Sequence, residues 1–329
     1  LSSASLSLAR RLRVSRSPKK VRTRPSCKRS YCASTEPSGT PTNPAGRINL
    51  VSSYQQCIED VKRLDYPHYF CSGYLPSNSR VTMMALRALN LETAAIKSHV
   101  QNSATAQLRL SWWKQAIDKA YQGESSGHHV TELLVPAIKE GKLTKGWFTR
   151  FLEGRARDLT TSQPRSLSDL ERYTEDVHSS LIYLGMESMD IRDLNADHAA
   201  SHVGKALGLV TLIKALPYHS KAREVYIPTE LTAKHNITSE MLFKAEFTPE
   251  IGEAIYEMAS LAHGHIEMAR ELTASLPEKA NLVLLPTEFY NDYLERLRYT
   301  NFNPYHAYVA TYSAMTRPRV MWNAYRKKF

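Results

Sequence analysis

A run of small and apolar residues from Ala199 to Ile213 constrains the fold of this chain more than any other feature. Its apolar positions recur every three or four residues, as on the core-facing side of a buried helix, namely at Ala199, Ala200, Val203, Ala206, Leu207, Val210 and Ile213. Ala200, Gly204 and Gly208 form a small-residue stripe at four-residue intervals, so a neighbouring backbone can approach closely. We expect a central helix that ends before Pro217.

Similar helical patterns, separated by short Gly, Pro, Asn and Ser punctuation, continue from about Leu50 to the C-terminus. We expect helices over residues 51–64, from about 79, and over 104–121, 129–140, 144–159, 167–189 and 249–276. The helix at 104–121 carries Leu108, Trp112 and Ala116 on one face, which predicts that this face packs inward. No strand alternation and no internal repeat is visible. The pattern predicts a single all-α domain of antiparallel helices over residues 50–329.

The net charge of +11 would suggest a nucleic-acid-binding surface if it were spread over the chain. Residues 1–35, however, contain ten Lys or Arg and no acid, which leaves 33 basic and 32 acidic residues in the remainder. The body is therefore almost neutral, and we expect no nucleic-acid partner. The basic segment is rich in Ser and Arg and precedes a Pro/Gly/Thr/Ser linker at 37–46, so residues 1–45 are predicted to be a mitochondrial presequence and disordered linker. The alternative is a merely disordered basic arm.

Cysteine usage and hydropathy exclude several further classes of protein. Cys27 and Cys32 fall in the predicted presequence, and Cys57 and Cys71 alone are too few for a disulfide framework or a zinc site. The longest apolar run in the central helix, residues 206–213, is far shorter than the roughly 20 residues that a membrane-spanning helix needs. Any association with a membrane is therefore expected to be peripheral.

The segment from Asn195 to Pro228 resembles the second aspartate motif of the squalene/phytoene synthase family. As in that family, a glycine-bearing helix runs through a polar loop into a V-Y-I-P exit at residues 225–228. The family's two motif aspartates fall on Ala215 and His219 of this chain. An L-P-x-x-x-R entry at residues 75–80 precedes the first aspartate motif, whose two aspartates fall on Ala94 and Ser98. The resemblance implies an isoprenoid-synthase-like helical bundle around a central cavity.

These four positions matter because carboxylates one helical turn apart can share magnesium ions that bridge a diphosphate leaving group. Alanine cannot ligate a metal, and a lone histidine is a poor ligand for magnesium. The resemblance therefore implies a pseudoenzyme with both Asp-x-x-x-Asp motifs lost, without catalytic residues, metal or cofactor.

Four further segments resemble a non-catalytic branch of the same superfamily, the mitochondrial complex I assembly factors: residues 87–92, 112–114, 173–184 and 197–205. This resemblance implies a factor that acts early in building NADH:ubiquinone oxidoreductase, in biogenesis of a membrane-arm subunit. The implied partners are complex I subunits or other assembly factors, and a lipid could occupy the cavity. The alternative is a divergent prenyl-diphosphate-binding protein or prenyltransferase.

Five polar residues are candidates for a pocket or an interaction surface. Ser179, Ser180 and Tyr183 could line a lipid pocket, although small hydroxyl groups more commonly face a neighbouring helix. His198 and His202 have the four-residue spacing of zinc ligands, but they lack an intervening HExxH glutamate and an evident third ligand. Helix capping, core hydrogen bonding or pocket lining is the favoured interpretation of these histidines.

The C-terminal segment combines cations with an amphipathic pattern. Arg317, Arg319, Arg326, Lys327 and Lys328 lie there, with apolar residues at helical spacing and one aromatic at the predicted interface: Val320, Met321, Ala324, Tyr325 and Trp322. An anionic membrane would attract such cations. The hydrophobic pattern alone equally fits a helix docked on the domain. The inferred task favours peripheral contact with the matrix side of the mitochondrial inner membrane.

Overall fold

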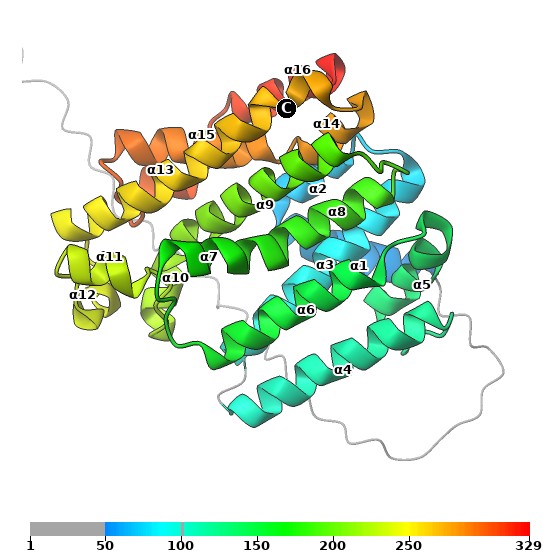
Figure 1. The fold of residues 1–329 in the computed structure, drawn as a ribbon, viewed down its shortest axis with the longest axis horizontal. Coiled ribbons are helices and arrows are strands. Elements are labelled where there is room, and N and C mark those ends of the chain that lie inside the picture. The colour runs from blue at the N-terminus through cyan, green and yellow to red at the C-terminus, as the bar shows by residue number, and fades with distance from the viewer. Residues whose placement is uncertain (1–49, 100–101) are drawn as a thin grey trace, which may run out of the picture. The chain divides into compact units, whose positions relative to one another are not determined.

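The computed structural model describes residues 50–99 and 102–329, and Figure 1 shows their arrangement. The predicted presequence and linker, residues 1–45, lie outside these residues and stay a prediction. The described residues contain helices and turns but no strand, which confirms the predicted all-α class. The longer elements are α1 (Leu50–Leu64), α3 (Ser77–His99), α4 (Ser103–Tyr121), α5 (His129–Gly141), α6 (Lys145–Thr160), α9 (Leu194–Lys214), α13 (Pro249–Glu271), α15 (Thr287–Tyr299) and α16 (Thr316–Arg326).

Shorter elements connect these helices. They are α2 (Tyr66–Ser72), α7 (Leu167–Thr174), η1 (Glu175–Ser179), α8 (Ser180–Glu187), α10 (Leu216–Ala222), α11 (Thr229–Lys234), α12 (Ser239–Phe243), η2 (Thr273–Ser275), α14 (Glu278–Leu284) and η3 (Ala307–Ala310). Several helix starts follow ordinary capping chemistry. The side chains of Asp193, Ser166 and Thr248, for example, accept hydrogen bonds from backbone amides in the first turns of α9, α7 and α13.

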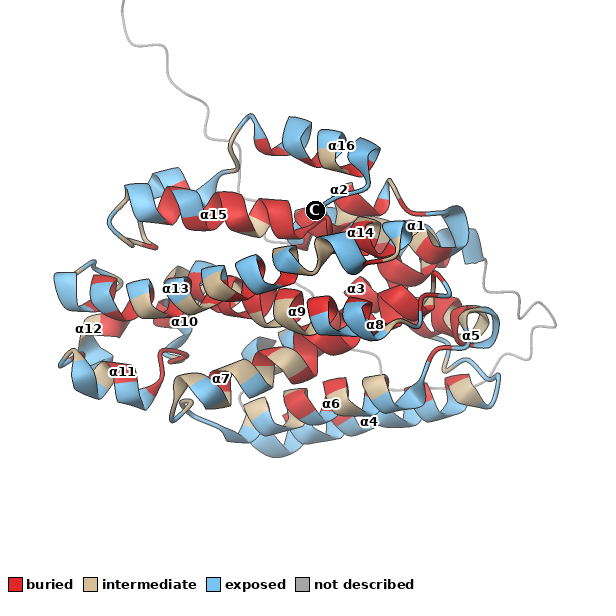
Figure 2. Ribbon diagram, turned by 45° about the horizontal axis from the view of Figure 1, so that its top comes forward, coloured by how far each residue is buried: buried red, intermediate tan, exposed pale blue. Residues whose placement is uncertain are grey.

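Helix α9 is the buried centre predicted from the small-residue stripe. It runs between α13 and the continuous stretch α7–η1–α8, and Figure 2 shows that it is buried over most of its length. The backbone of Gly204 lies directly against Ser179, and Gly208 lies against Thr174 and His178. Side chains at these two positions would separate the packed helices, so the glycines permit the close approach.

The single helix predicted over 167–189 contains a π-helical segment. Residues Glu175–Ser179 form η1 between α7 and α8, and the three elements follow one another without a loop. A π turn widens the helix by one residue and shifts the face that its side chains present. Here the change of register occurs where Thr174, His178 and Ser179 meet the glycines of α9. Hydrophobic periodicity alone does not reveal such a local shift.

The predicted inward face of α4 is wrong in part. Leu108 is 70% exposed and Trp112 is 40% exposed, whereas Ala116 is buried as expected. The buried side consists of Ala106, Leu110, Trp113, Ala116, Ile117 and Ala120. Helix α4 packs on α5 and α6, and this contact turns Trp113 inward while Trp112 lies at its edge. Two adjacent tryptophans suit the hydrophobic pattern equally well, so the sequence did not distinguish them.

The C-terminal helix α16 is docked on the domain through one side. Val320 and Ala324 join a small core cluster with Cys71, Leu285 and Phe289. Met321, Trp322 and Tyr325 are 56%, 58% and 81% exposed on the same helix. The helix therefore packs on the domain and also presents an aromatic outer surface.

Among the helices of the described residues, no single one is long and apolar enough to cross a membrane. The bent pair α9 and α10 reaches the required length and composition only together, across an angle of 55°.

Candidate functional site

A cavity of about 530 Å³ lies where α3, α6, α9 and α10 converge. Ala94 and Ser98 reach it from α3, Ala215 from the end of α9 and His219 from α10. The four positions at which the family resemblance places motif aspartates thus line one cavity, although they come from two distant parts of the sequence. Four cationic side chains, Arg87, Lys97, Arg155 and Lys214, and three acidic ones, Asp65, Asp158 and Glu224, also line it.

Asp158 is the acid at the centre of a polar wall. Its carboxylate accepts hydrogen bonds from Lys97 Nζ at 2.9 Å and from the Tyr226 hydroxyl at 2.9 and 3.0 Å, with the Tyr173 hydroxyl at 3.5 Å. Burial, followed by the influence of Tyr173 and Asp158, raises the pKa of the Tyr226 hydroxyl far above its ordinary value. Tyr226 therefore stays protonated and donates to Asp158. With Lys97 and Tyr173 also in contact, the Asp158 carboxylate has its hydrogen-bond acceptors occupied.

Asp65 is buried in a second charge network. Its Oδ2 lies 2.6 Å from Arg87 Nε and 2.5 Å from Arg87 Nη2, and its Oδ1 lies 2.8 Å from His68 Nδ1. Burial alone would raise the pKa of the Asp65 carboxyl, but Arg87 and His68 outweigh burial and hold it below its usual range. Asp65 therefore stays ionised and paired with Arg87 in the cavity wall.

The third acid, Glu224, is bonded to one of the motif positions. Its Oε2 lies 3.0 Å from His219 Nδ1, and this hydrogen bond is the main reason why the pKa of Glu224 is lowered. The His219 ring also lies 4.5 Å from the Tyr226 ring, centroid to centroid. His219 is thus held against one wall by two contacts.

Two lysines stand beside the substituted motif positions. Lys97 precedes Ser98 on α3, and Lys214 precedes Ala215 at the end of α9. Lys214 Nζ donates to the Tyr312 hydroxyl at 2.9 Å. Arg155 donates to Tyr173 and to Asn90, both at 2.8 Å, while its Nε is buried without a hydrogen-bond partner. Four cationic and three acidic side chains line the cavity, so its lining has a small excess of positive charge that favours an anionic ligand.

His178 of η1 also lines the cavity, and sequence reasoning did not select it. Burial, followed by the charges of Arg87 and Arg155, holds the pKa of this imidazole well below its ordinary value. His178 is therefore neutral at physiological pH. Its place in the π-helical segment explains why the spacing of the sequence gave no signal.

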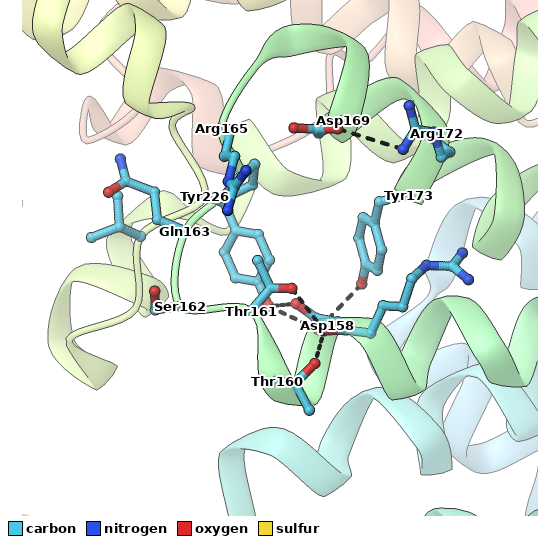
Figure 3. A pocket seen from close by; sticks show the side chains of 13 residues that line it. Asp158, Thr160, Thr161, Ser162, Gln163, Arg165, Asp169, Arg172, Tyr173 and Tyr226 are labelled. Carbon is cyan, nitrogen blue, oxygen red and sulfur yellow. Dashed lines mark hydrogen bonds and ion pairs between the residues drawn. The ribbon is translucent and has the colours of Figure 1, made fainter.

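A second cavity, of about 520 Å³, lies on the loop between α6 and α7, and Figure 3 shows its lining. It shares Asp158, Tyr173 and Tyr226 with the first cavity, so these three side chains separate the two spaces. Arg157, Arg165 and Arg172 also line it. Arg157 is ion-paired with Asp176, and Arg172 with Asp169 at 3.6 Å.

The five candidate pocket or interaction residues lie elsewhere, and none is among those that line these two cavities. Ser179 Oγ donates to the Ser201 carbonyl at 3.1 Å, whereas the buried Ser180 Oγ has no hydrogen-bond partner. The Tyr183 ring lies 4.4 Å from that of Trp147. Their role in an interaction stays a prediction.

The two candidate histidines lie one turn apart on α9 and have different surroundings. His202 Nδ1 lies 3.0 Å from Nδ1 of His265, whose Nε2 lies 2.8 Å from Glu171. His198 is exposed, so the structure joins His202 to α13 and α7 rather than to its neighbour at four-residue spacing.

Comparison with known proteins identifies the fold and the family. The family model for squalene/phytoene synthase matches residues 61–326. Among solved structures, a dehydrosqualene synthase in complex with ligand has a TM-score of 0.70 at 15% identity, covering 84% of this chain and 96% of that one. The squalene synthase HpnC from Alicyclobacillus acidocaldarius has a TM-score of 0.67 at 15% identity, covering 78% and 96%. These two likenesses concern the fold alone.

Curated relatives are more similar in sequence. The NADH dehydrogenase (ubiquinone) complex I, assembly factor 6 of Bos taurus is 34% identical over 83% of this chain and 82% of its own length. The protein of the same name from Homo sapiens is 35% identical, covering 76% and 75%, and the homolog from Dictyostelium discoideum is 37% identical, covering 77% and 72%. The chain therefore belongs to the squalene/phytoene synthase family, together with these assembly factor 6 relatives.

Proposed function

We propose that this chain is a non-enzymatic assembly factor for mitochondrial respiratory complex I, acting early and in the biogenesis of a membrane-arm subunit. The observation that carries the proposal is the similarity to relatives named complex I assembly factor 6, which extends over most of both chains. Complex I subunits or other assembly factors would be its partners.

The cavity supports a pseudoenzyme. A magnesium cluster for diphosphate departure needs several free carboxylates facing one another. Here Ala94, Ser98 and Ala215 supply none, and His219 is bonded to Glu224. Asp158 is engaged by Lys97 and Asp65 by Arg87, so recruiting them to a metal would break one partly buried and one buried ion pair. We propose that both aspartate motifs of the family are lost at these positions.

The alternative is a divergent prenyl-diphosphate-binding protein or prenyltransferase. It is favoured by the persistence of the cavity and by the lysines at its rim. A presqualene diphosphate synthase from Zymomonas mobilis is also 22% identical over 64% of this chain and 72% of its own length. A retained cavity with positive groups could hold an anionic lipid without catalysis, and we include such a lipid as an occupant.

Turnover and binding separate these functions. The purified protein is incubated with magnesium and radiolabelled farnesyl or geranylgeranyl diphosphate, beside an active squalene synthase. No condensed hydrocarbon is expected, since loss of the metal ions removes several kcal/mol of transition-state stabilisation and each 1.36 kcal/mol is tenfold in rate. Robust product formation would refute the pseudoenzyme. Native mass spectrometry of the protein from mitochondria then reports whether a lipid is bound.

A cellular experiment tests the assembly function itself. Cells without the protein should lose assembled complex I on native gels, and the wild-type chain should restore it. Variants Lys97→Ala and Lys214→Ala test whether the cavity contributes, with exposed Lys244→Ala as the matched control. Proximity labelling in these cells should recover complex I subunits or assembly factors. Normal complex I without the protein would contradict the proposal.

We place the mature protein at the matrix side of the mitochondrial inner membrane, peripherally attached. The exposed aromatic surface of α16 and its cations support this location. A basic N-terminal segment, as read from the sequence, supports import. Carbonate extraction should release the protein, and retention in the membrane pellet would contradict peripheral attachment.

A further inference from the structure

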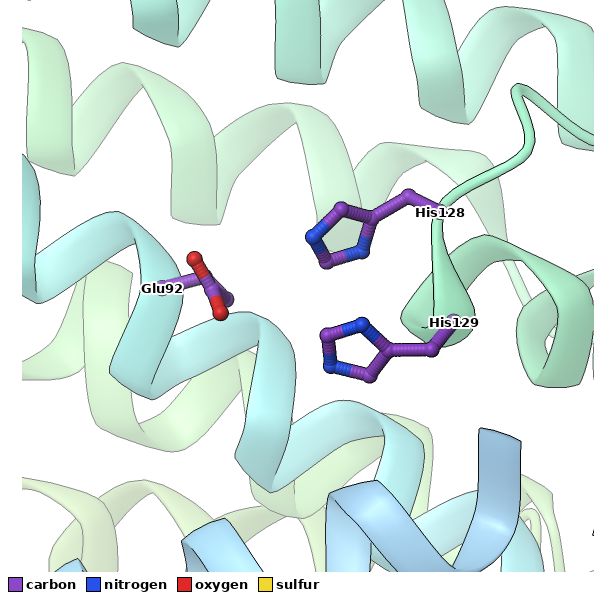
Figure 4. A group of neighbouring side chains, drawn as sticks. All are labelled: Glu92, His128 and His129. Atoms are coloured by element: carbon purple, nitrogen blue, oxygen red, sulfur yellow. The ribbon is translucent and has the colours of Figure 1, made fainter. Parts of the chain in front are cut away.

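Outside both cavities, three potential metal ligands meet between α3 and the start of α5. Glu92 comes from α3, His128 is the N-cap of α5, and His129 is its first residue, as Figure 4 shows. One ligand atom from each residue lies within 4.8 Å of the other two. Within the part of the chain that the structure describes, this is the one such group of three or more His, Cys, Asp or Glu.

The chemical types point to a transition metal rather than to magnesium. Two imidazoles and one carboxylate are the ligands that zinc accepts, while magnesium requires a shell of oxygens. Zinc binds histidine through a neutral imidazole nitrogen.

One ring nitrogen of the group has no hydrogen-bond partner within the protein. Nε2 of His129 is buried and has no hydrogen-bond partner, an arrangement that native proteins rarely keep. A metal ion would engage such a nitrogen. The aromatic rings of Trp112 and Trp113 lie 5.8 and 5.0 Å from the His128 ring and shield this side from water.

We propose that Glu92, His128 and His129 bind one zinc ion, which ties the start of α5 to α3. Three protein ligands leave a fourth zinc position for water or a small ligand. Ligand atoms on one tetrahedral zinc are roughly 3.4 Å apart, so the ligand atoms, which lie within 4.8 Å of one another, must approach by at most about 1.4 Å. Closing the site therefore requires side-chain rotation of Glu92 on α3 and of the two histidines at the start of α5.

Binding also changes the cap of α5. Nδ1 of His128 accepts a hydrogen bond from the backbone amide of Val130 at 3.3 Å. If zinc binds Nε2 of His128, Nδ1 carries the ring proton and cannot accept a hydrogen bond. If zinc binds Nδ1, its lone pair is already used. In both cases the hydrogen bond from the Val130 amide is lost. The amide resonance of Val130 should therefore shift when zinc binds.

Isothermal titration of the full chain without a histidine tag tests the site, with zinc chloride as the probe and magnesium chloride as comparison. One zinc per chain is expected and no magnesium at equal concentration. His129→Gln and Glu92→Gln should each weaken zinc binding at least tenfold and remove the zinc-induced rise in Tm. Exposed His263→Gln is the matched control and should bind as the wild type does.

X-ray absorption of the zinc-loaded protein identifies the ligands independently. Nitrogen and oxygen at about 2.0–2.2 Å without sulfur are expected. Sulfur in the shell would overturn the proposal by assigning the ion to cysteines, as would unchanged affinity in both variants or no zinc binding by the wild type. If His129→Gln fails to fold, His128→Asn replaces it, because Asn keeps the helix cap.

Discussion

Gly204 of α9 lies so close to Ser179 of η1 that no larger residue fits between the two backbones. A Cβ atom on Gly204 would come within 2.5 Å of Ser179 Cα and 2.6 Å of its backbone nitrogen. Because these neighbours are backbone atoms, they cannot rotate away. Gly204→Leu should lower the free energy of unfolding by at least about 1–3 kcal/mol, and Gly204→Ala in the same direction. Urea unfolding measures the effect, and cellular abundance should fall with it.

Gly264 of α13 is the matched control. A Cβ atom there would meet nothing within 4 Å. Gly264→Ala should leave stability unchanged or raise it by up to about 1 kcal/mol, since alanine favours the helix. If Gly204→Ala were as stable as Gly264→Ala, helix propensity and not close packing would govern both positions.

Arg87 and Asp65 form an ion pair in which both side chains are nearly fully buried, at 5% and 7% exposure. Arg87→Met leaves the Asp65 carboxylate without its main partner and should cost about 3–5 kcal/mol. The exposed pair of Arg63 and Asp60 serves as the control, and Arg63→Met should cost less than about 1 kcal/mol. Urea midpoints at pH 7 report both values. Similar costs would show that the buried pair adds nothing specific.

His178 gives the domain a pH dependence of known sign. Its folded pKa is below that of the unfolded chain, so the unfolded chain binds a proton first as the pH falls. The stability that comes from keeping this ring neutral is complete above about pH 6.5 and is lost as the pH falls towards the folded value. The groups facing the ring include Arg87 and Arg155, His68 and Asp65.

The measurement is the free energy of unfolding between pH 7.5 and pH 5. The wild type should lose stability over this range, and His178→Gln should lose less. His263→Gln removes an exposed histidine and should leave the slope of the wild type. An unchanged slope in His178→Gln would assign the pH dependence to other groups, such as His68, whose pKa is also lowered by burial.

Much of the fold was predictable because its signals are local. The periodicity of residues 199–213 and the stripe containing Gly204 and Gly208 predicted a buried helix with close contacts, and both glycines make them. The π-helical segment was not predictable, because one inserted residue in a turn hardly changes the hydrophobic pattern. The choice between Trp112 and Trp113 depended on how α4 packs, which its own sequence does not determine.

The candidate sites also divide into residues that local sequence motifs predicted and residues that only the packing brings together. Ala94, Ser98, Ala215 and His219 were found through family motifs, and the structure gathers them in one cavity. The sequence did not predict that Lys97 and Lys214 line the cavity, although they adjoin motif positions, because an isolated lysine on a helix carries no signal. Glu92 and the pair His128 and His129 are far apart in sequence. Only the packing of α3 against α5 brings them together.

The exposed aromatic surface of α16 should bind anionic membranes. Trp322 and Tyr325 lie 6.0 Å apart between ring centroids and are not used in docking the helix, which rests on Val320 and Ala324. Removing both aromatics by Trp322→Ala and Tyr325→Ala should therefore spare stability. It should weaken binding to cardiolipin-containing vesicles tenfold or more, since burying one aromatic side chain contributes about 1.5–3 kcal/mol.

Vesicle flotation at low and high salt separates the two contributions. Binding of the wild type should fall at high salt, because Arg317, Arg319 and Lys328 would attract the anionic headgroups. Tyr299, 74% exposed at the end of α15, is the matched control, and Tyr299→Ala should bind like the wild type. If the α16 double variant floats with vesicles as well as the wild type does, and at all salt concentrations, then α16 is an ordinary docked helix and membrane contact is made elsewhere.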